Sequence, residues 1–113
     1  MVAAFVLFIG LKPLHYTLET TSIKRVEIEK RNLQSVVQDV VRQVEAKNQK
    51  TLRVIYSPET LRENTREKNG GVFGNPPVEG SADDALTIVA FDYHCQWAYL
   101  DEQTILFYHI VGD

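Results

Sequence analysis

The stretch LQSVVQDVVRQVEAK, residues 33–47, decides the fold. Its apolar residues recur at spacings of three and four, which places them on one face of a helix. They are Leu33, Val36, Val37, Val40, Val41 and Val44. Valine is a weak helix former, so this helix needs a surface on which to pack its apolar face. We therefore expect a main amphipathic helix over 33–47, packed on a sheet.

The start of this helix has two interpretations. Apolar and charged residues alternate over 25–29, which indicates a strand. The same region also continues the helical spacing, with Thr21 or Ser22 as the N-cap, and the helix would then start near residue 22. The sequence leaves strand and helix open at 23–31.

Segments on both sides of the main helix are typical of strands. Residues 2–11 form a continuous apolar run, as in a central strand, and 15–19 and 51–56 form shorter candidates. Residues 85–100 are typical of one strand that exceeds the usual length, which predicts a bulge or bend in it. Asp101 and Glu102 then make the turn of a hairpin, and the chain returns over 103–111.

A short second helix is expected near 58–66, with Ser57 as N-cap and Pro58 at its first position. Residues 69–81 are rich in Gly, Pro and Asn, which predicts a long loop. Together these elements indicate an α+β fold, a curved antiparallel sheet of four to six strands packed on one main helix. A length of 113 residues fits a single domain, 1–113.

The composition excludes several classes of protein. The chain is 44% hydrophobic and 24% charged, which is unlike a disordered tail, a fibrous repeat or a disulfide scaffold. Its apolar start ends at Lys12 after eleven residues, whereas a bilayer span takes about 20, so we expect no membrane span. Cys95 is the single cysteine, which excludes an intrachain disulfide and favours a reducing compartment, such as the cytoplasm.

Charge is unevenly placed along the chain. Residues 24–68 hold eleven of the twelve basic residues and seven acids, a net charge of +4. Residues 69–113 hold seven acids and no Lys or Arg, a net charge of −7. A chain with two halves of opposite sign can dock on a charged partner or on a second copy of itself.

One polar cluster is predicted on the last hairpin. A register that pairs Trp97 with Leu106 places His94 directly opposite His109, with Asp92 two residues along the same face. Two imidazoles and a carboxylate can bind a divalent metal. The two imidazoles can instead form a pH-sensitive pair, or the groups can act as an acid and a base on a substrate. Two surface histidines without such a role are the simpler interpretation. A change of one residue in the turn would alter the pairing.

The first functional hypothesis is a non-enzymatic protein–protein interaction module that binds another protein or forms a homodimer. It follows from the missing catalytic motifs, the divided charge, and β-branched and aromatic strands with edges open to strand addition. The predicted interface consists of the sheet edge, the 69–81 loop with Phe73, and the basic helix face of Arg42, Lys47 and Lys50. No cofactor is expected for this function.

Two alternatives remain open. One is a small metal-dependent or acid/base protein that uses Asp92, His94 and His109, with a divalent metal as its cofactor. The other is a nucleic-acid-binding domain that uses the basic segment 24–68, which the net charge of −3 for the whole chain disfavours.

Overall fold

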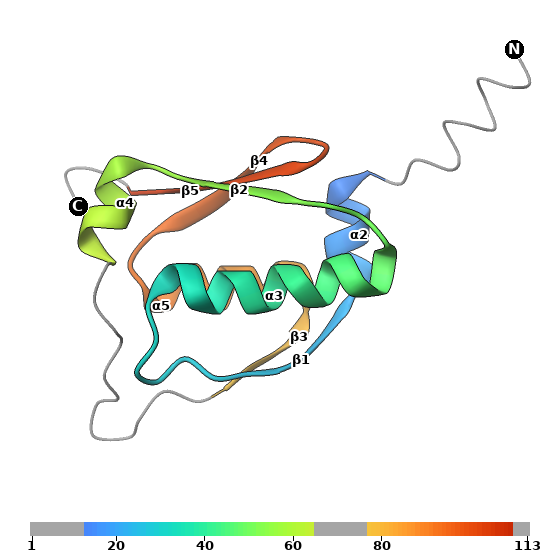
Figure 1. Cartoon of the computed structure of the whole chain (residues 1–113), viewed down its shortest axis with the longest axis horizontal. Coiled ribbons are helices and arrows are strands. Elements are labelled where there is room, and N and C mark those ends of the chain that lie inside the picture. Colours follow the sequence, from blue (N-terminus) through green and yellow to red (C-terminus); the bar gives the residue numbers. More distant parts are fainter. Residues whose placement is uncertain (1–12, 65–76, 110–113) are drawn as a thin grey trace, which may run out of the picture.

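The computed structural model describes residues 13–64 and 77–109, which form four helices and five strands (Figure 1). In chain order they are α2 (Leu14–Thr20), β1 (Ser22–Val26), α3 (Leu33–Asn48), β2 (Arg53–Tyr56), α4 (Pro58–Glu63), β3 (Val78–Ser81), α5 (Ala82–Asp92), β4 (Gln96–Asp101) and β5 (Thr104–Tyr108). The α+β class is therefore confirmed. None of the helices in these ranges is long and apolar enough to cross a membrane.

The strands form two small sheets on opposite sides of a helical layer (Figure 1). β1 pairs with β3 in an antiparallel ribbon. The other sheet has the order β2-β5-β4, with β2 parallel to β5 and β4 antiparallel to β5. The single curved antiparallel sheet that we expected is thus not what the described residues form.

Two strand–helix–strand halves explain why there are two sheets. The first half is β1-α3-β2 and the second is β3-α5-β4, followed by β5. Each half gives its first strand to the two-stranded sheet and its next strand to the three-stranded sheet. The two strands of each half therefore lie on opposite sides of the helical layer (Figure 1).

The core lies between the sheets, around the apolar faces of α3 and α5. All six predicted core residues of α3 are buried, as are Leu86 and Val89 of α5 and Ile105 and Phe107 of β5. Burying a side chain of this kind stabilises the fold by about 1.5–3 kcal/mol relative to its exposed state. The helix over 33–47 and the burial of its apolar face are therefore confirmed.

The N-cap decides where α3 begins. Asn32 accepts a hydrogen bond from the Ser35 backbone N–H at 2.9 Å through its side-chain oxygen, and Gln49 ends the helix in a left-handed conformation with φ of 50°. Residues 22–26 form β1 instead of an earlier helical turn. The strand interpretation therefore holds up to Val26, residues 27–31 are neither strand nor helix, and a helix start near 22 is wrong.

The largest error concerns residues 85–100, which are not one long strand. Residues 82–92 form α5, in which apolar residues recur at helical spacing, and Asp83 and Asp84 interact favourably with the positive end of the helix dipole in its first turn. His94 then adopts a left-handed φ of 56°, which turns the chain into β4. This segment is rich in β-branched and aromatic residues, which are typical of strands, and they led to the wrong prediction.

Other expectations need smaller corrections. Residues 15–19 belong to helix α2, and residues 78–81 of the expected loop form β3. The short second helix is confirmed as α4, and the strand over 51–56 as β2, within narrower bounds. The strand predicted over 2–11 and the loop over 69–76 lie outside the described residues.

The hairpin of β4 and β5 is confirmed, but its register is shifted by one residue. Trp97 pairs with Phe107 instead of Leu106, because Glu102 and Gln103 make the turn in place of Asp101 and Glu102. A shift of one residue moves every side chain to the other face of the strand. Phe107 is consequently in the core, whereas Leu106 lies half-buried on the outer face.

Candidate functional site

Among the strands of residues 13–64 and 77–109, β2 lies at one edge of the three-stranded sheet. On its inner side, the backbone N–H groups of Arg53 and Ser57 donate to Gln103 and Phe107 at 2.7 and 2.9 Å. In a parallel ladder the N–H and C=O of one residue point the same way, and those of the next residue point the opposite way. The backbone groups of Val54 and Tyr56 therefore point away from β5, along the open edge.

A hollow of about 400 Å³ lies beside this edge, between β2 and α3. One wall consists of polar and apolar residues of α3, and the other wall is β2 with the residue before it. The lining residues are Gln34, Gln38, Val41, Arg42, Glu45, Leu52, Val54 and Tyr56. The hollow therefore combines buried aliphatic side chains, two amides and one guanidinium next to an open strand edge.

Arg42 provides the positive charge of the hollow. Its nearest carboxylate oxygen belongs to Asp39 at 3.9 Å, while the other oxygen of Asp39 holds Arg31 at 2.7 Å. The Arg42 side chain is 66% exposed. Its ion pair with Asp39 is consequently long and open to solvent, which leaves the guanidinium accessible to a carboxylate from outside.

Two residues hold the walls of the hollow in place. The Glu45 carboxylate accepts a hydrogen bond from the Leu52 backbone N–H at 2.9 Å, which joins α3 to the start of β2. Tyr56 stacks on Phe107, with ring centroids 5.6 Å apart. Burial raises the pKa of Tyr56 to about 12, so its hydroxyl stays neutral and able to donate a hydrogen bond at pH 7.

Three of the four predicted interface residues are among the described residues, and they make different contacts. Arg42 lines the hollow, but Lys47 donates through its Nζ to the backbone oxygen of Ser22 and so joins α3 to β1. Lys50 is half-buried just after α3, and its backbone N–H donates to the Glu45 carbonyl. Phe73 lies outside the described residues. Arg42 is thus the predicted residue that the structure places at the candidate site.

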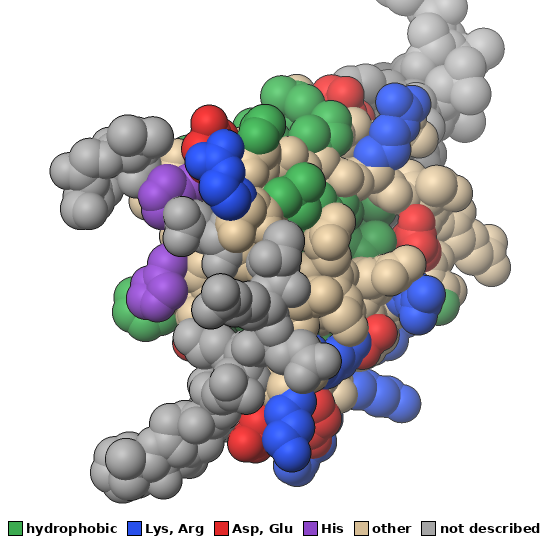
Figure 2. All heavy atoms as spheres, turned by 60° about the vertical axis from the view of Figure 1, so that its left-hand side comes forward, with side chains coloured by type: hydrophobic (Ala, Val, Ile, Leu, Met, Phe, Trp, Pro, Cys, Tyr) green, Lys and Arg blue, Asp and Glu red, His purple; other side chains and the backbone are tan. Residues whose placement is uncertain are grey.

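The predicted histidine cluster is not a cross-strand pair. His94 lies in the turn before β4, and the Nδ1 atom of His109 is 3.4 Å from the backbone oxygen of His94. Figure 2 shows two histidine side chains, coloured purple, at the left edge of the face that it draws. Asp92 is the last residue of α5. Within residues 13–64 and 77–109, no group of three or more His, Cys, Asp or Glu side chains is arranged to hold a metal ion.

The sequence analysis did not predict the hollow between β2 and α3, although two features of the sequence are consistent with it. Gln34, Gln38, Arg42 and Glu45 recur at helical spacing beside the apolar face of α3. The segment RVIY, residues 53–56, is short and alternates between inner and outer side chains. Neither feature shows that β2 is an edge strand, because strand order depends on pairing between distant segments.

Comparison with known proteins adds no information, since the chain matches no family model, no curated protein and no solved structure.

Proposed function

We propose that this protein is a protein–protein interaction module that binds an extended segment of its partner at β2. The segment adds a strand to the open edge of the sheet and inserts alternate side chains into the hollow between β2 and α3. The observation that carries this proposal is the outward direction of the Val54 and Tyr56 backbone groups beside a hollow of about 400 Å³.

The lining of the hollow indicates what kind of segment fits. Val41 and Leu52 provide an apolar base for an aliphatic side chain, and Arg42 attracts a carboxylate. Residues that face one side of a bound strand alternate along its sequence. We therefore expect a partner segment in which apolar and acidic residues occur two positions apart. A second copy of this chain is one candidate, because its acidic half offers carboxylates.

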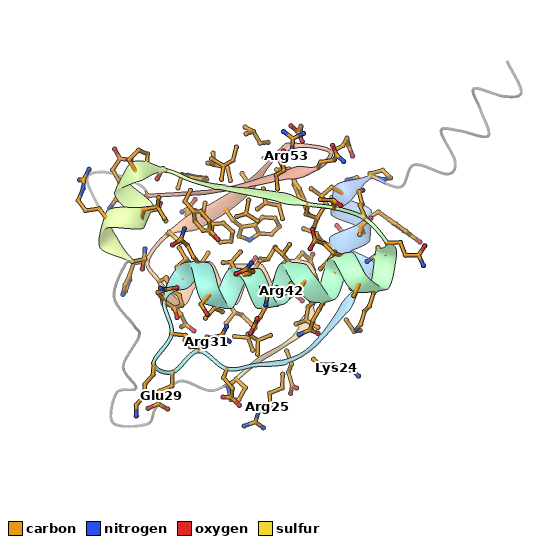
Figure 3. All side chains as sticks on the ribbon, viewed as in Figure 1. Lys24, Arg25, Glu29, Arg31, Arg42 and Arg53 are labelled. Carbon is orange, nitrogen blue, oxygen red and sulfur yellow. The ribbon has the colours of Figure 1, made fainter. Side chains whose placement is uncertain are left out.

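A nucleic-acid function has less support than a protein partner. Among the cations that Figure 3 labels, Lys24 and Arg25 lie on β1, Arg42 on α3 and Arg53 on β2. Two of them are already paired with carboxylates, Arg25 with Glu27 at 2.8 Å and Arg31 with Asp39 at 2.7 Å. Phosphate binding favours clustered cations without such partners.

A reducing compartment is proposed from the chemistry of Cys95. The thiol is buried, and burial raises its pKa to about 11, so it remains protonated at neutral pH. A buried neutral thiol acts as a small apolar side chain in the core. We infer a packing role for it, which needs no disulfide and no oxidising environment.

The test uses a library of random ten-residue peptides selected on the full chain. Val54→Pro removes one outward N–H at the open edge without removing a bond to β5, and proline is tolerated at such positions. Peptides selected by wild type should lose most of their affinity for this variant and should show alternating acidic and apolar residues. Peptides that bind both chains equally would contradict strand addition at β2.

Charge variants test the contribution of Arg42 to binding of the same peptides. Arg42→Gln should weaken the selected peptides several-fold at low salt, whereas Arg25→Gln, which removes an exposed cation of β1, should not. Light scattering at about 0.05 M and about 0.5 M salt reports self-association, because the screening length differs about threefold. A dimer that dissociates at high salt and is lost in Arg42→Gln would identify a second copy as the partner.

A further inference from the structure

A second group of elements, called the acidic half below, has a surface of opposite charge. The five elements α2, β3, α5, β4 and β5 contain no Lys or Arg. They carry six carboxylates, and the turn between β4 and β5 adds Glu102. These elements lie next to the basic ones, because β3 pairs with β1, β5 pairs with β2, and α5 packs on α3.

A second hollow, of about 180 Å³, lies in this acidic half where α2 begins and β4 ends. Leu14 and Leu100 form its apolar wall, His15 and Tyr99 its aromatic wall, and Asp101 and Glu102 its acidic rim. Leu100 is 56% exposed, so its side chain is accessible to an apolar group from outside. The hollow thus offers apolar, aromatic and anionic groups within the space of one long side chain.

Backbone hydrogen bonds hold both rim carboxylates in position. Glu102 accepts from the Leu14 N–H at 3.1 Å, and Asp101 accepts from the Gln103 N–H at 2.8 Å. The bond from Gln103 is the main reason that the pKa of Asp101 is lowered, with a smaller contribution from the charge of Arg53. Asp101 therefore stays negatively charged at neutral pH. The hydrogen bonds position both carboxylates without a ligand.

The aromatic wall continues along β4. The ring of Tyr99 makes edge-type contacts with His15 at 6.4 Å and with Trp97 at 5.1 Å between centroids. Tyr99 remains 42% exposed. Burial raises its pKa, and the negative charges of Asp83 and Glu19 raise it further, so the phenol is neutral and lies in a negative field. A neutral aromatic ring beside carboxylates is a favourable position for a cation.

We propose that this second hollow binds an arginine side chain from a basic segment of a partner protein. The guanidinium lies against the Tyr99 ring and pairs with Asp101 and Glu102, while the aliphatic stem packs on Leu100. Arginine fits better than lysine, because its planar group stacks on aromatic rings and pairs with carboxylates through several N–H groups. This site is independent of β2, which we expect to take an acidic segment.

The test is a titration of the full chain, isotopically labelled, with a ten-residue peptide of alternating arginine and serine. We expect amide shifts centred on Tyr99, Leu100 and Glu102, weaker binding of the lysine–serine peptide, and no binding of the glutamate–serine peptide. Shifts scattered over all acidic residues would overturn the proposal, because they would show a general attraction of charge.

A matched pair of double variants separates the hollow from the acidic half as a whole. Asp101→Asn with Glu102→Gln removes two charges at the rim and retains oxygens that accept the backbone bonds. Glu79→Gln with Asp84→Asn removes two charges on β3 and α5, outside the hollow. We expect the rim pair to weaken the arginine peptide roughly tenfold at low salt and the control pair less than about twofold. Equal losses would overturn the proposal.

Two single variants complete the test. Tyr99→Leu removes the ring at a partly exposed position and should weaken binding severalfold, whereas Tyr99→Phe should bind as wild type, since the ring face is what the cation contacts. Arg53→Gln removes a positive charge that acts on Asp101 and should strengthen binding. If the rim pair instead abolishes self-association of the protein, the occupant is a second copy and the proposal of a separate basic partner is wrong.

Discussion

The Tyr93 hydroxyl donates a hydrogen bond to the backbone oxygen of Arg31 at 2.7 Å, across 62 positions of sequence. Arg31 lies just before α3, and Tyr93 lies just after α5. The bond therefore joins the N-terminal end of one central helix to the C-terminal end of the other. Burial raises the pKa of Tyr93 to about 12, so the hydroxyl keeps its proton at neutral pH.

Replacing Tyr93 with Phe should lower the free energy of unfolding by about 1 kcal/mol, the usual net contribution of one hydrogen bond. Urea denaturation at pH 7 measures this difference. Tyr99→Phe is the control, because the hydroxyl of that exposed residue makes no such bond to the α3 region. Equal effects of the two variants would show that the Tyr93 bond contributes nothing to stability.

Alkaline pH should destabilise the fold. Burial raises the pKa of Tyr56 and Tyr93 to about 12 and that of Cys95 to about 11. In the unfolded chain these groups lose their protons at lower pH, so ionisation favours the unfolded state from about pH 9 upward. The stability that is present at pH 8 should therefore be lost as the pH rises toward 12. Urea midpoints at pH 8, 10 and 11 check this, and a midpoint that rises over this range would contradict the burial of these groups.

The register of the last hairpin predicts which of two neighbouring residues supports the core. Phe107 is fully buried, so Phe107→Ala should cost about 3–5 kcal/mol of unfolding free energy. Leu106 is half-buried on the outer face, so Leu106→Ala should cost about 1 kcal/mol. Thermal unfolding of both variants distinguishes the two registers, and a larger loss for Leu106 would restore the pairing expected from the sequence.

The start of α3 can be tested at its N-cap. Asn32→Ala removes the side-chain acceptor of the Ser35 N–H and should destabilise the protein by about 1 kcal/mol. Ser22→Ala, at the position where an earlier helix start would place its cap, should have almost no effect, because Ser22 lies exposed in β1. Comparable losses at both positions would indicate that the helix extends further than residue 33.

The candidate sites show where prediction from the sequence reached its limit. Arg42 was correctly placed on the exposed side of the main helix, because helical spacing is a local property. The hollow between β2 and α3, which Arg42 lines, depends on β2 being an edge strand. The second hollow depends on contact between Leu14 and Glu102, which are 88 positions apart. Local spacing carries no information about either relationship.

The sequence by itself determined the amphipathic helix α3, the short helix α4, the hairpin that ends the described chain, and the division of charge. Each of these depends on interactions between residues near one another in sequence. The tertiary structure decided that residues 82–92 are helical, that the strands form two sheets, and that His94 and His109 are not a cross-strand pair. The physical reason is that the apolar residues within 85–92 are compatible with either a strand or a helix. Only packing against distant segments selects the conformation that buries them.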